Sequence, residues 1–329
     1  MPATDLPRIP LGDLPTPYEP AERLAAEVGF RALWIKREDL SGPALGGNKI
    51  RQIEYILGAA RAAGADTVIT TAASQSNFCR ALAGCAARVG LSCRLLLRAA
   101  GGMEPVGNLL LMRMFGAEIT FTDATDPWHP SVREALEAIA DDVRAKGGTP
   151  FIVQLPGETA ALAVAAWALA CDELVEDFAL AGQVPDILAV ACGSALTFAG
   201  LALGFARHGL QTRMLGVSVQ QPASRLVPWV ADVMERGARL LEWDVKDPMA
   251  RVTITDDQIA PGYARPSDAG MRALKLAART EGLVLDPSYT AKALAGLIAA
   301  AAPGMTAAFL HSGGAPALFA HGAEVAAAL

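Results

Sequence analysis

Short runs of apolar residues alternate along this chain with longer, alanine-rich segments of helical character. A short apolar run is typical of a strand that is buried on both faces. Alternation of such runs with helical segments predicts an α/β fold built on parallel sheets whose faces are covered by helices. The predicted strands are residues 33–35, 67–70, 93–97, 118–121, 187–190, 214–218 and 307–310. The predicted helices are residues 51–63, 78–89, 105–115, 130–145, 159–180, 196–208, 267–281 and 291–300.

Length and composition restrict the class of protein. A chain of 329 residues, 52% of them hydrophobic, is long enough for two domains or one large α/β unit with an ample core. A net charge of −6 without a basic cluster argues against a nucleic-acid partner. The first ten residues lack a signal-peptide pattern, and no uncharged stretch is long enough to span a bilayer.

The cysteines favour a reducing compartment. Their number is odd, and their spacing matches neither a zinc site nor a disulfide framework. We therefore expect reduced thiols in a cytoplasmic protein and no bound metal. Cys79 and Cys192 adjoin two of the motifs described below, where small packing residues are a better interpretation than catalytic thiols.

Lys49 is the strongest candidate for chemistry. It follows Gly46-Gly47-Asn48 and precedes a predicted helix, just after the strand 33–35 and its polar end. Glycines let the backbone approach a ligand closely, and burial disfavours the charged form of a lysine. A lysine with a lowered pKa can form a Schiff base with an aldehyde cofactor. A solvated surface charge is the alternative for a lysine considered alone.

A strand, a turn of small residues and a helix follow one another at residues 187–208. The turn and the helix start are Cys192, Gly193, Ser194, Ala195, Leu196 and Thr197. Free N–H groups at a helix start suit a phosphate, and Asn48 and Thr197 could add side-chain hydrogen bonds. The glycine fingerprint of dinucleotide-binding proteins is absent, which favours a phosphate monoester over NAD.

Gln75-Ser76-Asn77 lies between the strand 67–70 and the helix that begins near Phe78. Ser76 and Asn77 are common helix N-cap residues, so capping explains them in isolation. Ligand binding is compatible with capping, because both use the same free N–H groups.

Five motifs in this order resemble the pyridoxal-phosphate (PLP) enzymes that include D-cysteine desulfhydrase and 1-aminocyclopropane-1-carboxylate (ACC) deaminase. They are Gly46–Arg51, Gln75–Asn77, Cys192–Ala195, Asp286–Thr290 and His311–Pro316, and the resemblance extends from Leu14 to Ala317. It implies the fold of type II PLP enzymes, with two domains that each contain an open, mostly parallel sheet. The larger, PLP-binding domain would comprise residues 1–51 and 159–329, and a smaller inserted domain residues 52–158. The resemblance also implies a homodimer.

The resemblance assigns a role to each site residue. Lys49 would form the Schiff base with PLP and act as general base. Gln75 and Ser76, with the following backbone amides, would hold the substrate carboxylate, and Asn77 would face the ring oxygen of PLP. Ser76 would also assist proton movement at the substrate. Tyr263 and Tyr289 would lie beside the substrate. Thr290 would lie near the pyridine nitrogen, for which Ser312 is a second candidate.

The implied activity is β-elimination from a small 3-substituted amino acid, which yields pyruvate, ammonia and a leaving group such as sulfide. The deaminase branch has a glutamate where this chain has Thr290, and a neutral hydroxyl there disfavours ACC deamination. Arg265, next to the substrate-side tyrosine motif, could bind a sulfonate, which would suit a cysteate sulfo-lyase; a solvated loop charge is the simpler interpretation. A member that binds PLP without turnover is the alternative of another class.

Overall fold

Two separate β-sheets form the framework of the molecule. The structure is a computed structural model that describes residues 6–98, 104–124, 129–154 and 157–329. The strands are β1 (Tyr18–Pro20), β2 (Ala32–Lys36), β3 (Thr67–Ala73), β4 (Ser92–Arg98), β5 (Glu118–Thr122), β6 (Pro150–Val153), β7 (Ile187–Cys192), β8 (Arg213–Ser218), β9 (Val252–Thr255) and β10 (Thr306–Leu310).

Helices connect these strands. They are α1 (Glu22–Val28), α2 (Lys49–Ala62), α3 (Asn77–Arg88), α4 (Gly107–Met114), α5 (Pro130–Ala145), α6 (Thr159–Leu169), α7 (Cys171–Leu180), α8 (Leu196–Arg207), α9 (Ala223–Leu240), α10 (Asp268–Glu281), α11 (Thr290–Ala299), α12 (Ala315–Ala320) and α13 (Gly322–Ala328). A short 3₁₀ helix covers Glu38–Leu40.

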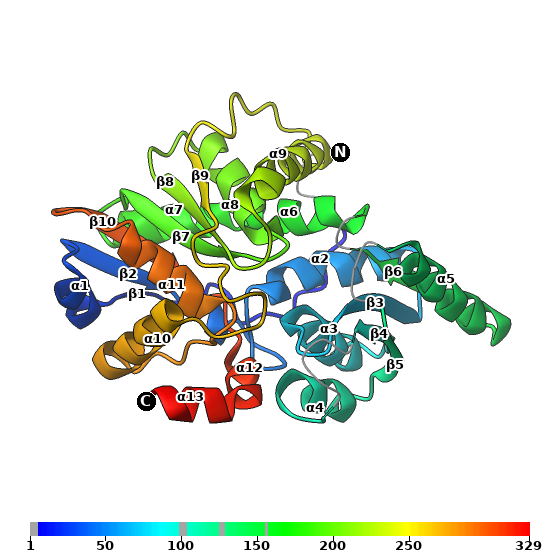
Figure 1. Cartoon of the computed structure of the whole chain (residues 1–329). Coiled ribbons are helices and arrows are strands. Elements are labelled where there is room, and N and C mark those ends of the chain that lie inside the picture. The colour runs from blue at the N-terminus through cyan, green and yellow to red at the C-terminus, as the bar shows by residue number, and fades with distance from the viewer. Residues whose placement is uncertain (1–5, 99–103, 125–128, 155–156) are drawn as a thin grey trace.

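The larger sheet has the strand order β1-β2-β10-β7-β8-β9, and only β1 runs antiparallel to its neighbour. Its central strands alternate their side chains between two cores: Leu188 and Val190 pack with α6, α8 and α9, whereas Ile187 and Ala189 pack with α1, α10 and α11. Figure 1 shows these two helical layers on opposite faces of the sheet. Both faces are apolar because both are covered, as is usual for a parallel sheet.

The smaller sheet has the order β5-β4-β3-β6 and is parallel throughout. Val68 and Leu95 face the core formed with α2, α3 and α4, while Ile69 and Leu96 face α5. Within the chain, this sheet lies between β2 and β7 of the larger one. The carboxyl end of a parallel strand is where such folds place ligands, and both sheets provide such ends.

The fold class predicted from the sequence is confirmed, and each of the seven predicted strands is present. One predicted helix is wrong in extent: residues 159–180 form two helices that meet at Ala170. The sequence pattern missed three strands and several helices, namely β1, β6, β9, α1, α9, α12 and α13. The domain boundaries proposed above stay a prediction.

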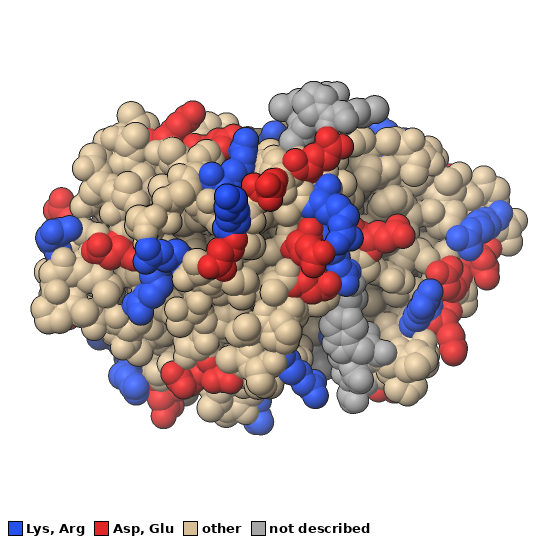
Figure 2. Space-filling view, turned by 90° about the horizontal axis from the view of Figure 1, so that it is seen from above, with Lys and Arg blue, Asp and Glu red and all other residues tan. Residues whose placement is uncertain are grey.

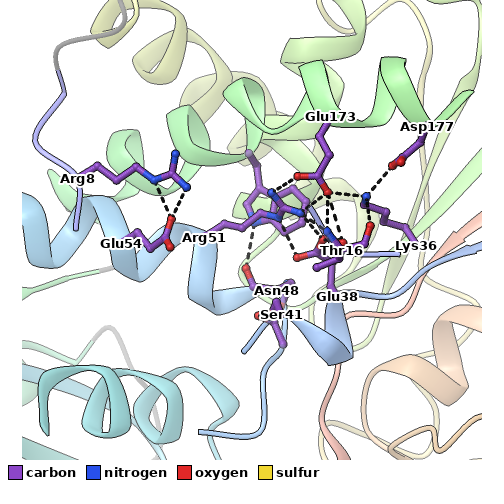
Figure 3. A network of polar contacts seen from close by, with 12 residues as sticks. Arg8, Thr16, Lys36, Glu38, Ser41, Asn48, Arg51, Glu54, Glu173 and Asp177 are labelled. Atoms are coloured by element: carbon purple, nitrogen blue, oxygen red, sulfur yellow. Dashed lines mark hydrogen bonds and ion pairs between the residues drawn. The ribbon is translucent and has the colours of Figure 1, made fainter. Parts of the chain in front are cut away.

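A buried network of charges ties the start of α2 to the larger sheet and to α7 (Figure 3). Arg51 donates to both carboxylate oxygens of Glu38, at 2.9 and 2.8 Å, and to both of Glu173, at 2.9 and 2.7 Å. Lys36, at the end of β2, pairs with Glu173 at 2.5 Å and with Asp177 at 2.6 Å. Because opposite charges surround each member, the cost of removing these groups from water is offset locally. The first turn of α2 is therefore fixed in position.

The surface carries charges of both signs. On the face shown in Figure 2, basic and acidic side chains lie interleaved. Among the residues that the structure describes, no helix is long and apolar enough to cross a membrane.

Candidate active site

A cavity of about 720 Å³ lies between the two sheets. Its wall includes residues at or just beyond the carboxyl ends of β3 and β7, together with the starts of α2, α3 and α8. Ten of the predicted site residues line it: Asn48, Lys49, Ser76, Asn77, Gly193, Ser194, Thr197, Tyr263, Tyr289 and Ser312. Gln75, Cys192, Ala195, Leu196 and Thr290 do not appear on the wall.

Lys49 is the first residue of α2 and lies on the cavity wall. The turn before it requires glycine, because Gly46 and Gly47 have φ values of 57° and 110°. A Cβ at Gly46 would also lie 2.4 Å from the Asp39 carbonyl oxygen. Burial lowers the pKa of Lys49 to about 8, so a substantial fraction of the amine is neutral just above neutral pH.

Asn48 is held on three sides. Its backbone N–H donates to the Ser312 carbonyl at 3.1 Å, and its carbonyl accepts from the Trp167 indole at 3.2 Å. Its side-chain amide donates to Thr197 Oγ1 at 2.9 Å. These contacts link the start of α2 to the start of α8 and to the segment after β10.

The start of α8 suits a phosphate. Its first N–H groups have no intrahelical partner, and the helix dipole favours an anion there. Gly193 leaves the approach open, since a Cβ at that position would lie 3.1 Å from the Tyr289 ring. Thr197 Oγ1 accepts from Asn48 and also from Gln52 at 2.9 Å, which leaves its O–H to donate to a ligand.

Three residues of this turn have buried side chains and can contribute only backbone groups. Cys192, Ala195 and Leu196 are at most 3% exposed. The Cys192 thiol faces the core, because a Cβ on Gly216 would meet its sulfur at 3.0 Å, and burial raises its pKa. This fits the packing interpretation of Cys192. Ala195 has the left-handed φ of 60° that turns the chain into the helix.

Ser76 caps α3, since its Oγ accepts from the Cys79 N–H at 3.2 Å, and it also lines the cavity. Gln75 is turned away from the cavity. Its side-chain amide donates to the Val106 carbonyl at 3.1 Å, and its side-chain oxygen accepts from the Asn108 N–H at 3.0 Å. Only its backbone remains available to a carboxylate.

Asn108, at the start of α4, fixes which end of Asn77 faces the cavity. Its Nδ2 donates to the Gln75 carbonyl at 2.9 Å and to Asn77 Oδ1 at 2.8 Å. A carbonyl can only accept, so Asn108 must present its nitrogen there, and Asn77 must then present its oxygen to Asn108. The Asn77 Nδ2 is left for the cavity, as a donor suited to an anionic oxygen. The sequence pattern gave no sign of this role, because it depends on a contact between two helix starts.

Tyr263 and Tyr289 meet at the cavity wall, with their hydroxyl groups 2.5 Å apart. Burial raises the pKa of both phenols, so both are neutral near pH 7. Thr290 is fully buried and its hydroxyl is bonded to the Asp286 carboxylate at 2.8 Å. The side chain at the cavity wall near this segment is Ser312, which is also a neutral hydroxyl.

Sequence reasoning missed the basic side chains of the wall, which are Arg98, Arg133 and Arg225. Arg98 ends β4, so the rule that ligands bind beyond the carboxyl ends of strands would have identified it. Arg265 is exposed and is absent from the cavity wall. The interpretation of Arg265 as a solvated loop charge is the one that fits the structure.

Comparison with known proteins identifies the family. The model of the family described as "Pyridoxal-phosphate dependent enzyme" matches residues 9–313. The chain belongs to this family. Its cofactor is pyridoxal phosphate, as predicted.

Two relatives have a more specific description. The chain is 38% identical to "D-cysteine desulfhydrase" of Klebsiella pneumoniae (strain 342), over 97% of each chain. A second Klebsiella pneumoniae protein of that name, from strain ATCC 700721 / MGH 78578, matches equally. A solved structure described as an ACC deaminase homologue superposes with a TM-score of 0.88 at 30% identity, over 99% of this chain and 97% of the other. An O-ureido-L-serine synthase structure, at a TM-score of 0.67, 15% identity and coverage of 94% and 92%, shows likeness of fold alone.

The residues of the cavity fit PLP. Lys49 supplies an amine with a lowered pKa, and the start of α8 with Thr197 supplies donors for a phosphate. Asn77 Nδ2 would donate to the ring oxygen, and Ser312 offers a hydroxyl on the same wall.

We expect the change Asn108→Asp to weaken PLP binding. The aspartate would bring oxygen against the Gln75 carbonyl and against Asn77 Oδ1, so Asn77 would turn and present oxygen to the cofactor. Losing a buried hydrogen bond of this kind costs about 1–3 kcal/mol, or roughly 5- to 150-fold in Kd. Fluorescence titration of the apoprotein with PLP measures it.

The control is Leu109→Ala, which removes a buried side chain from the same helix without touching the amide groups. It should lower the melting temperature and leave the PLP affinity unchanged. An Asn108→Asp protein that binds PLP within twofold of the parent would contradict the proposed orientation of Asn77.

Proposed function

We propose that this protein is a PLP-dependent β-eliminating lyase that acts on a small 3-substituted amino acid, with D-cysteine as the first candidate. The observation that carries the proposal is the position of Lys49. Its amine has a pKa lowered to about 8 and lies on the wall of a cavity that the starts of α3 and α8 also line. The identity to two D-cysteine desulfhydrases over nearly the whole chain supports the reaction class.

Each residue has a defined task in the proposed reaction. The start of α3, with Ser76 as its cap, holds the substrate carboxylate through free N–H groups. Lys49 accepts the α-proton, since its amine is partly neutral near pH 8. PLP, when bound, supplies the electron-accepting ring that makes this proton acidic. The paired phenols of Tyr263 and Tyr289, which line the same cavity, give a proton to the departing group.

β-Elimination requires less electron withdrawal by the pyridine ring of PLP than opening the cyclopropane ring of ACC does. Of the described residues that line the cavity, none is a carboxylate, and Thr290 bonds to Asp286. A carboxylate beside the pyridine nitrogen would keep it protonated and strengthen the ring as an electron acceptor. The neutral hydroxyl of Ser312 suits loss of an α-proton followed by departure of a good leaving group. This favours the lyase over an ACC deaminase.

An assay of keto-acid production tests this function. The PLP-loaded protein is incubated with D- and L-cysteine, both enantiomers of β-chloroalanine, and ACC. We expect pyruvate from a cysteine enantiomer and from chloroalanine, and little 2-oxobutyrate from ACC. Lys49→Ala should lower kcat about 100- to 10,000-fold, the range expected for loss of a general base. Bound PLP without a keto acid from any substrate would support a binding protein instead.

A second candidate function is the elimination of sulfite from cysteate. Arg98 is 9% exposed and lines the cavity, and Arg133 and Arg225 lie at its more exposed rim. Burial raises the pKa of Tyr263 and Tyr289, and the charge of Arg98 offsets part of that rise, so Arg98 acts on the substrate side. A cation there would suit an anionic β-substituent.

The change Arg98→Met separates the two substrates. If Arg98 binds the sulfonate of cysteate, the change should lower kcat/KM for cysteate about 10- to 100-fold more than kcat/KM for chloroalanine. This is the cost of losing a charged hydrogen-bond partner. Equal losses for both substrates would assign Arg98 to a group that they share, such as the α-carboxylate.

We also propose that the protein is a homodimer. Val106, which precedes α4, Leu110 and Met114 of α4, and Phe319 of α12 are exposed apolar side chains, and α12 packs against α4. Large exposed apolar patches usually mark interfaces. We also propose a cytoplasmic location, which the buried, unpaired cysteines support.

Light scattering tests the assembly. The parent protein should have twice the mass of one chain, and the double change Leu110→Glu with Met114→Glu should give one chain mass, because charge in an apolar interface is costly. A dimer that survives both changes would exclude this patch.

A further inference from the structure

Lys292 is a buried lysine whose hydrogen bonds within the described part of the chain all go to backbone carbonyls. It belongs to the first turn of α11, and its side chain has 0% exposure. Its Nζ donates to the carbonyl oxygens of Ile259 and Gly262, both at 3.0 Å, and of Ala260 at 3.4 Å. The hydrogen bonds and ion pairs described for Lys292 include no carboxylate.

The geometry fits the charged form of this group. An ammonium has three N–H donors and no acceptor, and three carbonyl oxygens surround it. A neutral amine would have two donors and a lone pair directed at one of the carbonyls. Burial lowers the pKa of Lys292, and the three acceptors counter this effect by binding the charged form.

The segment that Lys292 holds leads directly into the active site. Residues 259–262 precede Tyr263, whose hydroxyl meets that of Tyr289. Tyr289 immediately precedes α11, the helix that carries Lys292. The contacts therefore form a closed ring. The start of α11 carries Tyr289, Tyr289 contacts Tyr263, and the loop before Tyr263 bonds to Lys292 of the same helix.

A set of carbonyl oxygens around one positive charge is also how proteins bind hard cations. We propose that Lys292 is a built-in monovalent cation: its ammonium occupies a carbonyl site that would otherwise suit K⁺ or NH₄⁺, and so positions Tyr263 at the substrate side. The role of Tyr263 in turnover rests on the proposed function, whereas the cation site does not.

The consequence for the natural protein is that monovalent cations have no effect. At constant ionic strength, activity and melting temperature should be the same in ammonium, potassium and tetramethylammonium chloride. Tetramethylammonium is the reference, because it cannot donate hydrogen bonds and is too large for the site.

Removal of the lysine should create a site that free cations fill. In tetramethylammonium, Lys292→Ala should lose kcat/KM about 100-fold, the order expected when a reacting group is misplaced by an ångström. Ammonium or potassium should restore at least tenfold of this loss and raise the melting temperature, because a ligand that binds the folded state stabilises it. Lys292→Met, whose side chain fills the same space without charge, is the matched control and should not respond to any cation.

Melting temperature and near-ultraviolet circular dichroism report the fold directly, so they test the cation site without any measurement of substrate turnover. If Lys292→Ala does not fold in tetramethylammonium, recovery of the folded spectrum in ammonium or potassium supports the proposal. A loss that no cation reverses, or an alanine variant that behaves as the parent in every salt, overturns it. If the parent turns over no substrate, the proposed function fails, while the salt dependence of stability still decides the role of Lys292.

Discussion

The placement of Lys49 depends on the buried ion pairs of Arg51 two residues later. Arg51 belongs to the first turn of α2, and Glu38 and Glu173 hold its guanidinium from the 3₁₀ helix after β2 and from α7. The Trp167 ring lies beneath the guanidinium, at 5.3 Å, and its indole N–H bonds to the Asn48 carbonyl. Loss of one partner from such a network typically costs about 3–5 kcal/mol, because a buried charge is left uncompensated. Lys49 is therefore positioned by contacts of Arg51 that lie outside the cavity.

With Arg51 held by these ion pairs, three helix starts can meet at one cavity. The first turns of α2, α3 and α8 all contribute to its wall, and each start carries the positive end of its helix dipole. An anionic ligand such as a phosphate or a carboxylate gains from this field. A lysine ammonium does not, which agrees with a site where burial lowers the pKa of Lys49. Neutral groups, Asn77, Thr197 and Ser312, complete the wall around the expected position of the cofactor.

The parts of the fold that the sequence predicts are those whose burial leaves a pattern. Strands β3, β4, β7, β8 and β10 are covered on both faces and appear as apolar runs. The missed strands β1 and β9 are short, and β9 lies at a sheet edge with alternating threonines. Helix α9 contains Pro228, which disguises an amphipathic stripe of Leu226, Val230 and Val233. The break at Ala170 has no turn residue to mark it.

Which residues gather at the cavity could be predicted to a similar extent. The motifs identify Lys49, Ser76, Asn77 and the α8 turn, because backbone geometry restricts the residues that fit there. The direction of a side chain that bonds outside its own motif cannot be inferred in this way: Gln75 turns to α4 because Gly107 and Asn108 receive it. The bond between Thr290 and Asp286 is local, and an aspartate four residues before Thr290 could have suggested it.

The central claim is that Lys49 is the amine that bonds to the aldehyde of PLP. Reduction of the PLP-loaded protein with borohydride, followed by digestion and mass spectrometry, locates the pyridoxyl group. We expect it on the peptide that contains Lys49. The rate of PLP capture by the apoprotein should rise with pH through the Lys49 pKa of about 8 and level off above it, because the neutral amine is the nucleophile. A pyridoxyl group on Lys36, Lys292 or any other lysine, or no adduct at all, would contradict the account.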